Sequence, residues 1–414
     1  MTSGVASGPA PRADASVRLL AAAAFFSGAA LRICDSLLPR LGRDFGLTPG
    51  AAGQVIIGFA VAYGLMQLVF GPLADRYGKA RLICAALFGS SVGALACALA
   101  PGFGTLVVLR VGWGMAAAGV IPLAMAWIGD AVPYEQRQAT LARFLTGTLS
   151  GMMAGQLAGG LFADSAAGWR GAFLTLSVGY AVVALMLLAR IRAATPATAP
   201  SPAATATTRV SRDGLVRQLR TVLQVKWVRV VLAAGGAEGL FLLGPMSYLP
   251  AYLHQRFQLS LTAASALIAF YALGGLLYAL SARPIVRRFG ERRMVLIGGV
   301  LMGAGYLAWL LSPIWQLAGP IALLVGFGTY LFHNTLQTHA TQMAPALRGT
   351  AVALFAFCLF VGQGLGVTVA GFAFDHLGAT PLLLVPALAL PLIGWAFARA
   401  LRRRADAAAE TVTA

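Results

Sequence analysis

Long apolar runs alternate with short polar segments along almost the whole chain. In the first half, the runs cover residues 17–38, 50–70, 82–101, 104–129, 139–163 and 169–190. In the second half, they cover residues 227–250, 260–282, 294–312, 317–341, 349–374 and 380–399. A helix of about 20 apolar residues is long enough to span the hydrocarbon core of a bilayer. The pattern therefore predicts an all-α integral membrane protein with 12 transmembrane helices.

Composition and charge support this class and indicate an orientation. Of the 414 residues, 59% are hydrophobic and 11% are charged, whereas soluble domains are typically about 25% charged. The net charge of +18 would suggest nucleic-acid binding in a soluble protein. With the N-terminus placed in the cytoplasm, however, 25 of the 31 Lys and Arg residues fall in cytoplasmic segments. This asymmetry predicts an inner-membrane protein with both termini in the cytoplasm and no nucleic-acid partner.

The two halves of the chain are related by an internal repeat. At an offset of 212 positions, one set of residues aligns as Pro72 with Pro284, Arg76 with Arg288, Gly78 with Gly290 and Arg81 with Arg293. At an offset of 211, Ser36, Leu38 and Pro39 align with Ser247, Leu249 and Pro250. The repeat predicts two pseudo-symmetric six-helix bundles, 17–190 and 226–400, with a transport site between them near the membrane midplane.

The remaining segments are predicted to be cytoplasmic. They are an N-terminal tail, 1–16, a linker, 191–225, and a C-terminal tail, 401–414. Within the linker, the stretch 193–214 is rich in Pro and small polar residues and is expected to be flexible. Residues 215–223 follow with apolar side chains on one helical face. They predict an amphipathic helix on the membrane surface, with its basic face toward lipid headgroups.

Four charged side chains lie well inside the predicted spans: Arg32, Asp35, Arg110 and Glu238. Each costs roughly 2.5–3.5 kcal/mol at the bilayer centre, so such residues usually face a cavity or a partner. We expect Asp35 to carry a proton beside Arg32 or Arg110, because burial disfavours its charged form and a nearby Arg favours it. A permanent ion pair that fixes helix packing is the alternative. Glu238 has no basic neighbour in sequence, and we expect it to be a second proton site, a contact for a cationic substrate or a packing residue.

Uncharged polar side chains inside the spans are candidates for the cavity wall. They are Tyr63, Gln67, Gln156, Tyr330, His333, Asn334, Gln337 and Gln363, and Glu238 belongs with them. Hydrogen bonds between packed helices are the competing interpretation. The chain shows no metal-ligand spacing and no nucleophile–base pair, so we expect no metal, no cofactor and no enzymatic activity.

Three motifs resemble those of one transporter family. Gly71-x-Leu73-x-Asp75-Arg76-x-Gly78-Lys79-x-Arg81 resembles the signature between helices 2 and 3 of the major facilitator superfamily. The segment 109–114, which contains Arg110, resembles its fourth-helix motif. The segment 155–160 is similar to its antiporter motif, with Gln156 in place of a proline. Together with Trp169-Arg170-x-x-Phe173, these motifs favour the twelve-helix drug:proton antiporter branch.

The resemblance implies a monomeric transporter that couples proton movement to alternating access and exports a small organic compound. It also implies a conformational clamp formed by Gly71, Asp75, Arg76, Gly78, Arg81 and Asp130. In this clamp, Asp75 lies near the start of the eleventh span, after Arg348, and Arg76 reaches Asp130 or Glu135. A proton symporter that imports an organic anion held by Arg32 and Arg110 is one alternative. A non-transporting membrane sensor is another.

Overall fold

The computed structural model describes residues 11–194 and 212–413, which form helices joined by short turns. The first half contains α1 (Pro11–Phe45), α2 (Pro49–Ala52), α3 (Gln54–Tyr77), α4 (Lys79–Ala98), α5 (Phe103–Ala117), α6 (Val120–Ala131), α7 (Tyr134–Asp164) and α8 (Gly168–Ala194). The second half contains α9 (Arg212–Gln224), α10 (Lys226–Glu238), the π-helix η1 (Gly239–Leu243), α11 (Gly244–Met246), α12 (Leu249–Phe257), α13 (Leu261–Leu311), the 3₁₀ turns η2 (Trp315–Leu317) and η3 (Pro345–Leu347), α14 (Ala318–Gln342), α15 (Arg348–Leu377) and α16 (Ala379–Thr413).

Twelve membrane crossings follow from these helices. Within the described ranges, 10 helical segments are long and apolar enough to cross a membrane, and α13 is one of them. At 51 residues, α13 makes two crossings joined at Gly290, where the backbone leaves the helical region. The less apolar α7, with 31 residues, adds another crossing. The predicted all-α membrane fold with 12 spans is confirmed.

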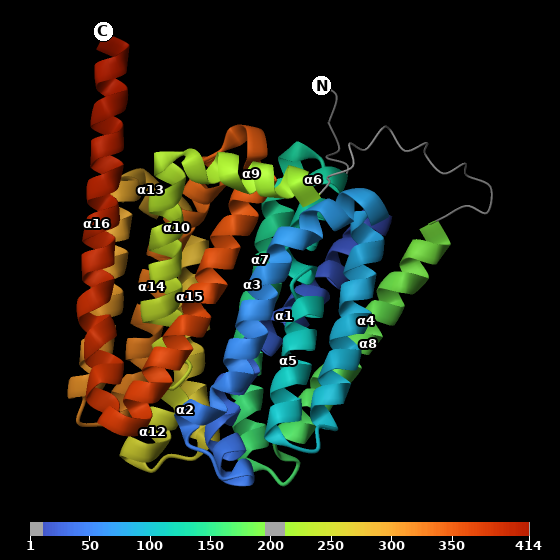
Figure 1. Ribbon diagram of the computed structural model, residues 1–414, viewed down its shortest axis with the longest axis vertical. Coiled ribbons are helices and arrows are strands. Elements are labelled where there is room, and N and C mark those ends of the chain that lie inside the picture. Colours follow the sequence, from blue (N-terminus) through green and yellow to red (C-terminus); the bar gives the residue numbers. More distant parts are fainter. Residues whose placement is uncertain (1–10, 195–211, 414) are drawn as a thin grey trace, which may run out of the picture.

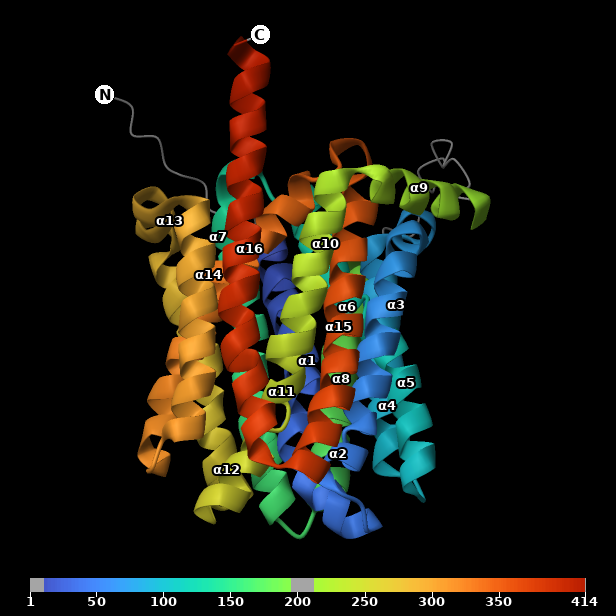
Figure 2. The same ribbon diagram turned by 60° about the vertical axis from the view of Figure 1, so that its left-hand side comes forward.

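The crossings pack as two groups. The helices α1 and α3 to α8 contact one another in the first group, and α10 to α16 do so in the second (Figure 1). The groups meet along two seams, α7 against α13 and α3 against α15. The amphipathic α9 lies across one end of the bundle, beside the end of α3 (Figure 2), and contacts α10 and α15. We call this the basic end, because most of the Lys and Arg residues lie there; the other is the opposite end.

Both copies of the repeated loop make the same turn. Gly78, between α3 and α4, has φ +85°, and Gly290, within α13, has φ +67°. Residues with a side chain rarely adopt this left-handed region, so both turns depend on glycine. The repeat detected in the sequence therefore corresponds to a glycine-dependent turn in both halves.

Two helices extend beyond the predicted apolar runs. The polar stretch between the runs 17–38 and 50–70 is helical as far as Phe45, because α1 continues through Pro39. An Arg40–Asp44 ion pair of 2.9 Å, four residues apart, supports that extra turn. The predicted tail at 401–414 is helical as far as Thr413, where α16 ends. The predicted amphipathic helix is present as α9, whereas most of the linker before it lies outside the described residues.

Candidate functional site

A buried ion pair in α1 forms the first part of the candidate site. The Arg32 guanidinium donates to Asp35 Oδ2 at 3.2 Å, one helical turn away, and Asp35 is 1% exposed. Asp35 Oδ1 accepts no hydrogen bond from any described residue. The hydroxyl of Ser247, which lies beside it in the other half, donates to Leu243 instead. Asp35 is thus a buried carboxylate with one oxygen paired to Arg32 and the other without a hydrogen bond from the described residues.

Arg110, the other candidate partner of Asp35, lies within electrostatic range of it but forms no ion pair with it. Its guanidinium lies over the rings of Phe59, Trp113 and Phe173 at 4.1, 4.7 and 5.9 Å from their centroids. Its Nε donates to the Val55 carbonyl at 3.1 Å. The aromatic faces stabilise the cation without a carboxylate. Of the two pairings expected for Asp35, the structure contains the one with Arg32.

The second half contains its own buried acid with a basic partner. Glu238, 1% exposed, ends α10, and His333 of α14 places Nδ1 at 3.0 and 2.9 Å from its two carboxylate oxygens. The π-helical turn η1 follows Glu238 directly. Such turns are often found at functional sites because they alter the register of the side chains that follow. No basic residue is close to Glu238 in sequence, and its partner His333 lies 95 positions away on another helix.

Two tyrosines lie between the acid pairs. Arg32 lies over the ring of Tyr271 of α13, with 5.7 Å between the guanidinium carbon and the ring centroid. Tyr271 and Tyr330 are both within electrostatic range of Arg32 on one side and of Glu238 on the other. The sequence interpretation missed Tyr271, although a tyrosine within the eighth predicted span was a usable signal.

Most of the other polar candidates pack against neighbouring helices, and one is exposed. Gln67 donates to the Ala118 carbonyl at the break between α5 and α6, and Gln156 donates to Ser36, next to Asp35. Tyr63 packs on Phe360 across the α3–α15 seam, and Tyr330 packs on Gly275. Asn334 donates to the Tyr278 hydroxyl, and Gln363 of α15 is buried. Gln337, one turn from His333 toward the basic end, is exposed.

The proposed clamp residues lie at the basic end but do not join the halves here. Asp130 of α6 pairs with Lys79, whereas Arg76 lies over the neighbouring Tyr77 ring. Asp75 and Arg81 are exposed, and among the described residues neither has an ion-pair partner. The expected contacts of Arg76 with Asp130 and of Asp75 with the start of α15 are absent in this conformation. Glu135, the other expected partner of Arg76, has no described side chain.

At the opposite end, two aspartates do join the halves, and we call these contacts the twin latches. In the first, Asp164 at the end of α7 accepts from the backbone N–H groups of Leu261 and Thr262, at 3.3 and 2.7 Å, and from the Thr262 hydroxyl at 2.7 Å. In the second, Asp375 of α15 accepts from the Gly50 N–H at 3.0 Å and from the Thr48 hydroxyl. Each carboxylate thus caps the start of a helix in the other half.

The twin latches are related by the internal repeat. Asp164 and Asp375 are 211 positions apart, as are Gly160 and Gly371, one turn earlier. A Cβ on Gly160 would lie 2.6 Å from the Leu261 carbonyl oxygen, and one on Gly371 would lie 2.9 Å from the Gly50 Cα. Each latch therefore combines a glycine that permits close helix approach with an aspartate that caps the facing helix. The structure is closed at this end.

Two six-helix groups that enclose buried acid pairs define a polytopic membrane transporter. The sequence profile of the Major Facilitator Superfamily matches residues 20–367 and 245–413, and the chain belongs to that family. The MFS-type transporter YceJ of Bacillus subtilis is 25% identical over 86% of this chain and 89% of its own. An MFS-type efflux pump of Mycolicibacterium smegmatis is 27% identical over 87% of each chain. The solved nucleoside transporter NupG shares the fold with a TM-score of 0.74 and 14% identity, covering 92% of this chain and 98% of its own.

We expect Asp75→Asn to leave expression unchanged and to slow transport turnover about two- to fivefold. The clamp is predicted to form when the basic end closes, where Asp75 would face the N-terminus of α15. A carboxylate at a helix N-terminus contributes about 0.3–1 kcal/mol, which sets the size of the effect. The measurement is the initial rate of transport in vesicles, normalised to the amount of protein. An unchanged rate would remove the clamp role from Asp75.

Proposed function

We propose that this protein is a proton-coupled transporter that exports a small organic compound by alternating access. The observation that carries the proposal is the placement of the two buried acid–base pairs. Arg32–Asp35 lies in one half and Glu238–His333 lies in the other, with Tyr271 and Tyr330 between them. Buried acids are costly inside a membrane protein unless they pair or exchange protons, and they commonly mark coupling sites.

The contacts of Arg32 and Arg110 favour export over the import of an organic anion. An anion site built from Arg32 and Arg110 would need both guanidinium groups to face one cavity. Arg32 is paired with Asp35, and Arg110 is enclosed by aromatic rings. Similarity to the MFS-type efflux pump of Mycolicibacterium smegmatis also supports export. With the basic end in the cytoplasm, the twin latches would close the external side of the transporter.

Proton flux in inside-out membrane vesicles tests this function. A pH-sensitive dye reports an energised, acid-inside gradient while cationic drugs, sugars, amino acids and organic acids are added in turn. We expect one class of compound to dissipate the gradient, and vesicles with Asp35→Asn to show no such response. If a compound leaves the vesicle lumen together with protons, the protein is a symporter. If no compound from any class moves protons, proton-coupled transport of these substrates is excluded.

We expect Glu238→Gln to raise KM for the transported compound about tenfold while the protein still folds. The glutamine keeps the shape of the side chain but removes the charge that holds His333, and charge-assisted hydrogen bonds contribute roughly 1.5–3 kcal/mol. Glu291→Gln is the matched control, because Glu291 forms a second acid–histidine pair, 3.1 Å from His339, near the basic end. Wild-type KM and proton stoichiometry in Glu238→Gln would exclude Glu238 from the site.

A further inference from the structure

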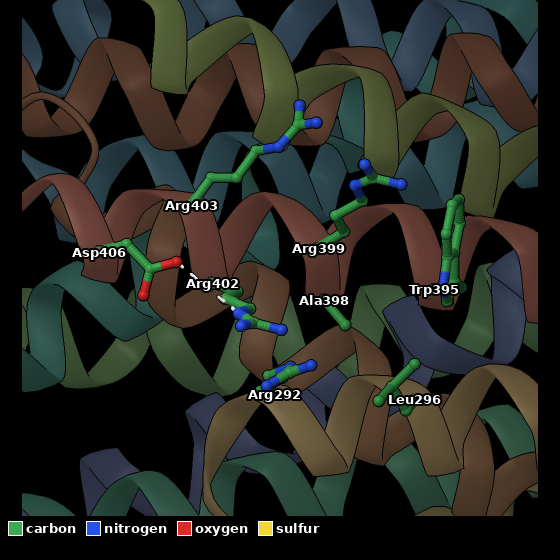
Figure 3. A pocket seen from close by; sticks show the side chains of 8 residues that line it. All are labelled: Arg292, Leu296, Trp395, Ala398, Arg399, Arg402, Arg403 and Asp406. Atoms are coloured by element: carbon green, nitrogen blue, oxygen red, sulfur yellow. Dashed lines mark ion pairs between the residues drawn. The ribbon is translucent and has the colours of Figure 1, made fainter.

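A basic groove between α13 and α16 is not used by the transport mechanism. Its volume is about 420 Å³, and it lies at the basic end, where α13 resumes after Gly290. The lining residues are Arg292, Leu296, Trp395, Ala398, Arg399, Arg402, Arg403 and Asp406. Figure 3 shows Arg292 and Arg402 approaching each other from the two helices, while the side chains of Arg399 and Arg403 extend away from Arg292.

Among the residues whose side chains are described, the charge in this groove is not balanced. Four guanidinium groups line it with one carboxylate, Asp406, which lies 3.7 Å from Arg402 at the outer end. The next acid along α13, Glu291, bonds to His339 instead. Arginines from two helices that converge in this way repel one another unless an anion lies between them, and guanidinium groups match phosphate oxygens in geometry.

The apolar surface next to the groove indicates where such an anion comes from. Leu388, Leu392 and Trp395 are 62%, 64% and 53% exposed. Their spacing places them on the face of α16 that continues through Arg399 to Arg402. The Arg399 guanidinium lies over the Trp395 ring at 5.3 Å, and an exposed tryptophan beside basic residues is typical of a membrane interface. One helix face thus carries exposed leucines and, further toward the C-terminus, the arginines of the groove.

We propose that this groove binds the phosphate of an anionic phospholipid from the cytoplasmic leaflet. The headgroup lies between Arg292 and Arg402, and one acyl chain runs along Trp395, Leu392 and Leu388. Basic pockets between membrane helices on the cytoplasmic side recognise anionic headgroups in this way. A free phosphate would satisfy the arginines but would leave the apolar strip uncovered. The lipid would also brace α16 against the turn of α13 at Gly290.

Lipid binding to the full-length protein in detergent tests the proposal. Native mass spectrometry counts bound lipid, and thermal unfolding measures Tm, with phosphatidylglycerol, phosphatidylcholine of the same acyl chains or inorganic phosphate added. We expect phosphatidylglycerol alone to remain bound and to raise Tm. We expect Arg292→Gln/Arg402→Gln to weaken its binding at least tenfold. Trp395→Ala should weaken it several-fold with all four arginines intact.

The control is Arg287→Gln/Arg288→Gln, which removes the same charge from the same cytoplasmic turn of α13 but outside the groove. It should bind phosphatidylglycerol as the wild type does. Equal weakening in both double variants would show a general charge effect and overturn the site. Retention of inorganic phosphate with the same sensitivity to Arg292→Gln/Arg402→Gln would identify a soluble anion instead. Equal binding of phosphatidylcholine would also contradict the proposal.

Discussion

Replacing Asp35 with asparagine is expected to abolish proton-driven accumulation of the transported compound while leaving exchange intact. The asparagine side chain has nearly the same shape and still offers an oxygen to Arg32, but it cannot bind and release a proton. Asp35 Oδ1, which no described residue satisfies, is the atom that the proton would occupy. The measurement is accumulation against an imposed pH gradient, and we expect it to fall at least tenfold. Counterflow, in which labelled and unlabelled compound exchange without net proton movement, should remain.

The counterflow measurement distinguishes a proton-coupling role of Asp35 from a role in helix packing. Removing one partner of a buried ion pair costs about 3–5 kcal/mol, because the other charge is left uncompensated. If the Arg32–Asp35 pair only fixes helix packing, accumulation and counterflow should fall together. Asp35→Glu, which retains a titratable carboxylate, should recover part of the accumulation. Full gradient-driven accumulation in Asp35→Asn would contradict the coupling role, and so would equal loss of both activities in Asp35→Asn.

The architecture could be predicted from the sequence because it depends on local properties. Span length and apolar content determine which segments cross the membrane, and the turns at Gly78 and Gly290 need a residue that tolerates positive φ. The exceptions were helix ends. There, Arg40 and Asp44 stabilise an extra turn of α1 that their polarity alone would assign to a loop.

The partners within the candidate site could not be predicted, because they meet only through packing. Glu238 and His333 were each identified as candidates, but nothing local in the sequence joins residues on α10 and α14. The aromatic enclosure of Arg110 uses side chains of α3, α5 and α8. Asp164 and Asp375 were missed because acids at helix ends usually lie in water. The signal was the Gly-x-x-x-Asp spacing, present at the same repeat offset in both halves.

Removing both latches should open the opposite end of the transporter. Asp164 accepts three hydrogen bonds and Asp375 accepts two, all from the other half. Asparagine has one acceptor oxygen and no charge, so each Asp→Asn change should destabilise the closed conformation by roughly 1–2 kcal/mol. About 1.4 kcal/mol corresponds to a tenfold change in an equilibrium constant. We therefore expect about a tenfold shift for either single variant and about a hundredfold shift for the double variant.

Spin labels at Ala166 and Gln255, exposed on the two halves at this end, would report the opening as a longer distance in pulsed EPR. Asp44→Asn is the matched control, because the partners of Asp44 among the described residues, Arg40 and Trp169, belong to its own half. Partial burial opposes ionisation of Asp164, but the Thr262 and Leu261 hydrogen bonds and His254 hold its pKa below the usual range. Its latch is therefore complete above the ordinary Asp pKa of about 3.9 and weakens only as pH falls through the lowered value. Protonation of Asp164 should therefore not open this latch between about pH 5 and 8. An unchanged distribution in the double variant would show that the latches do not hold this end closed.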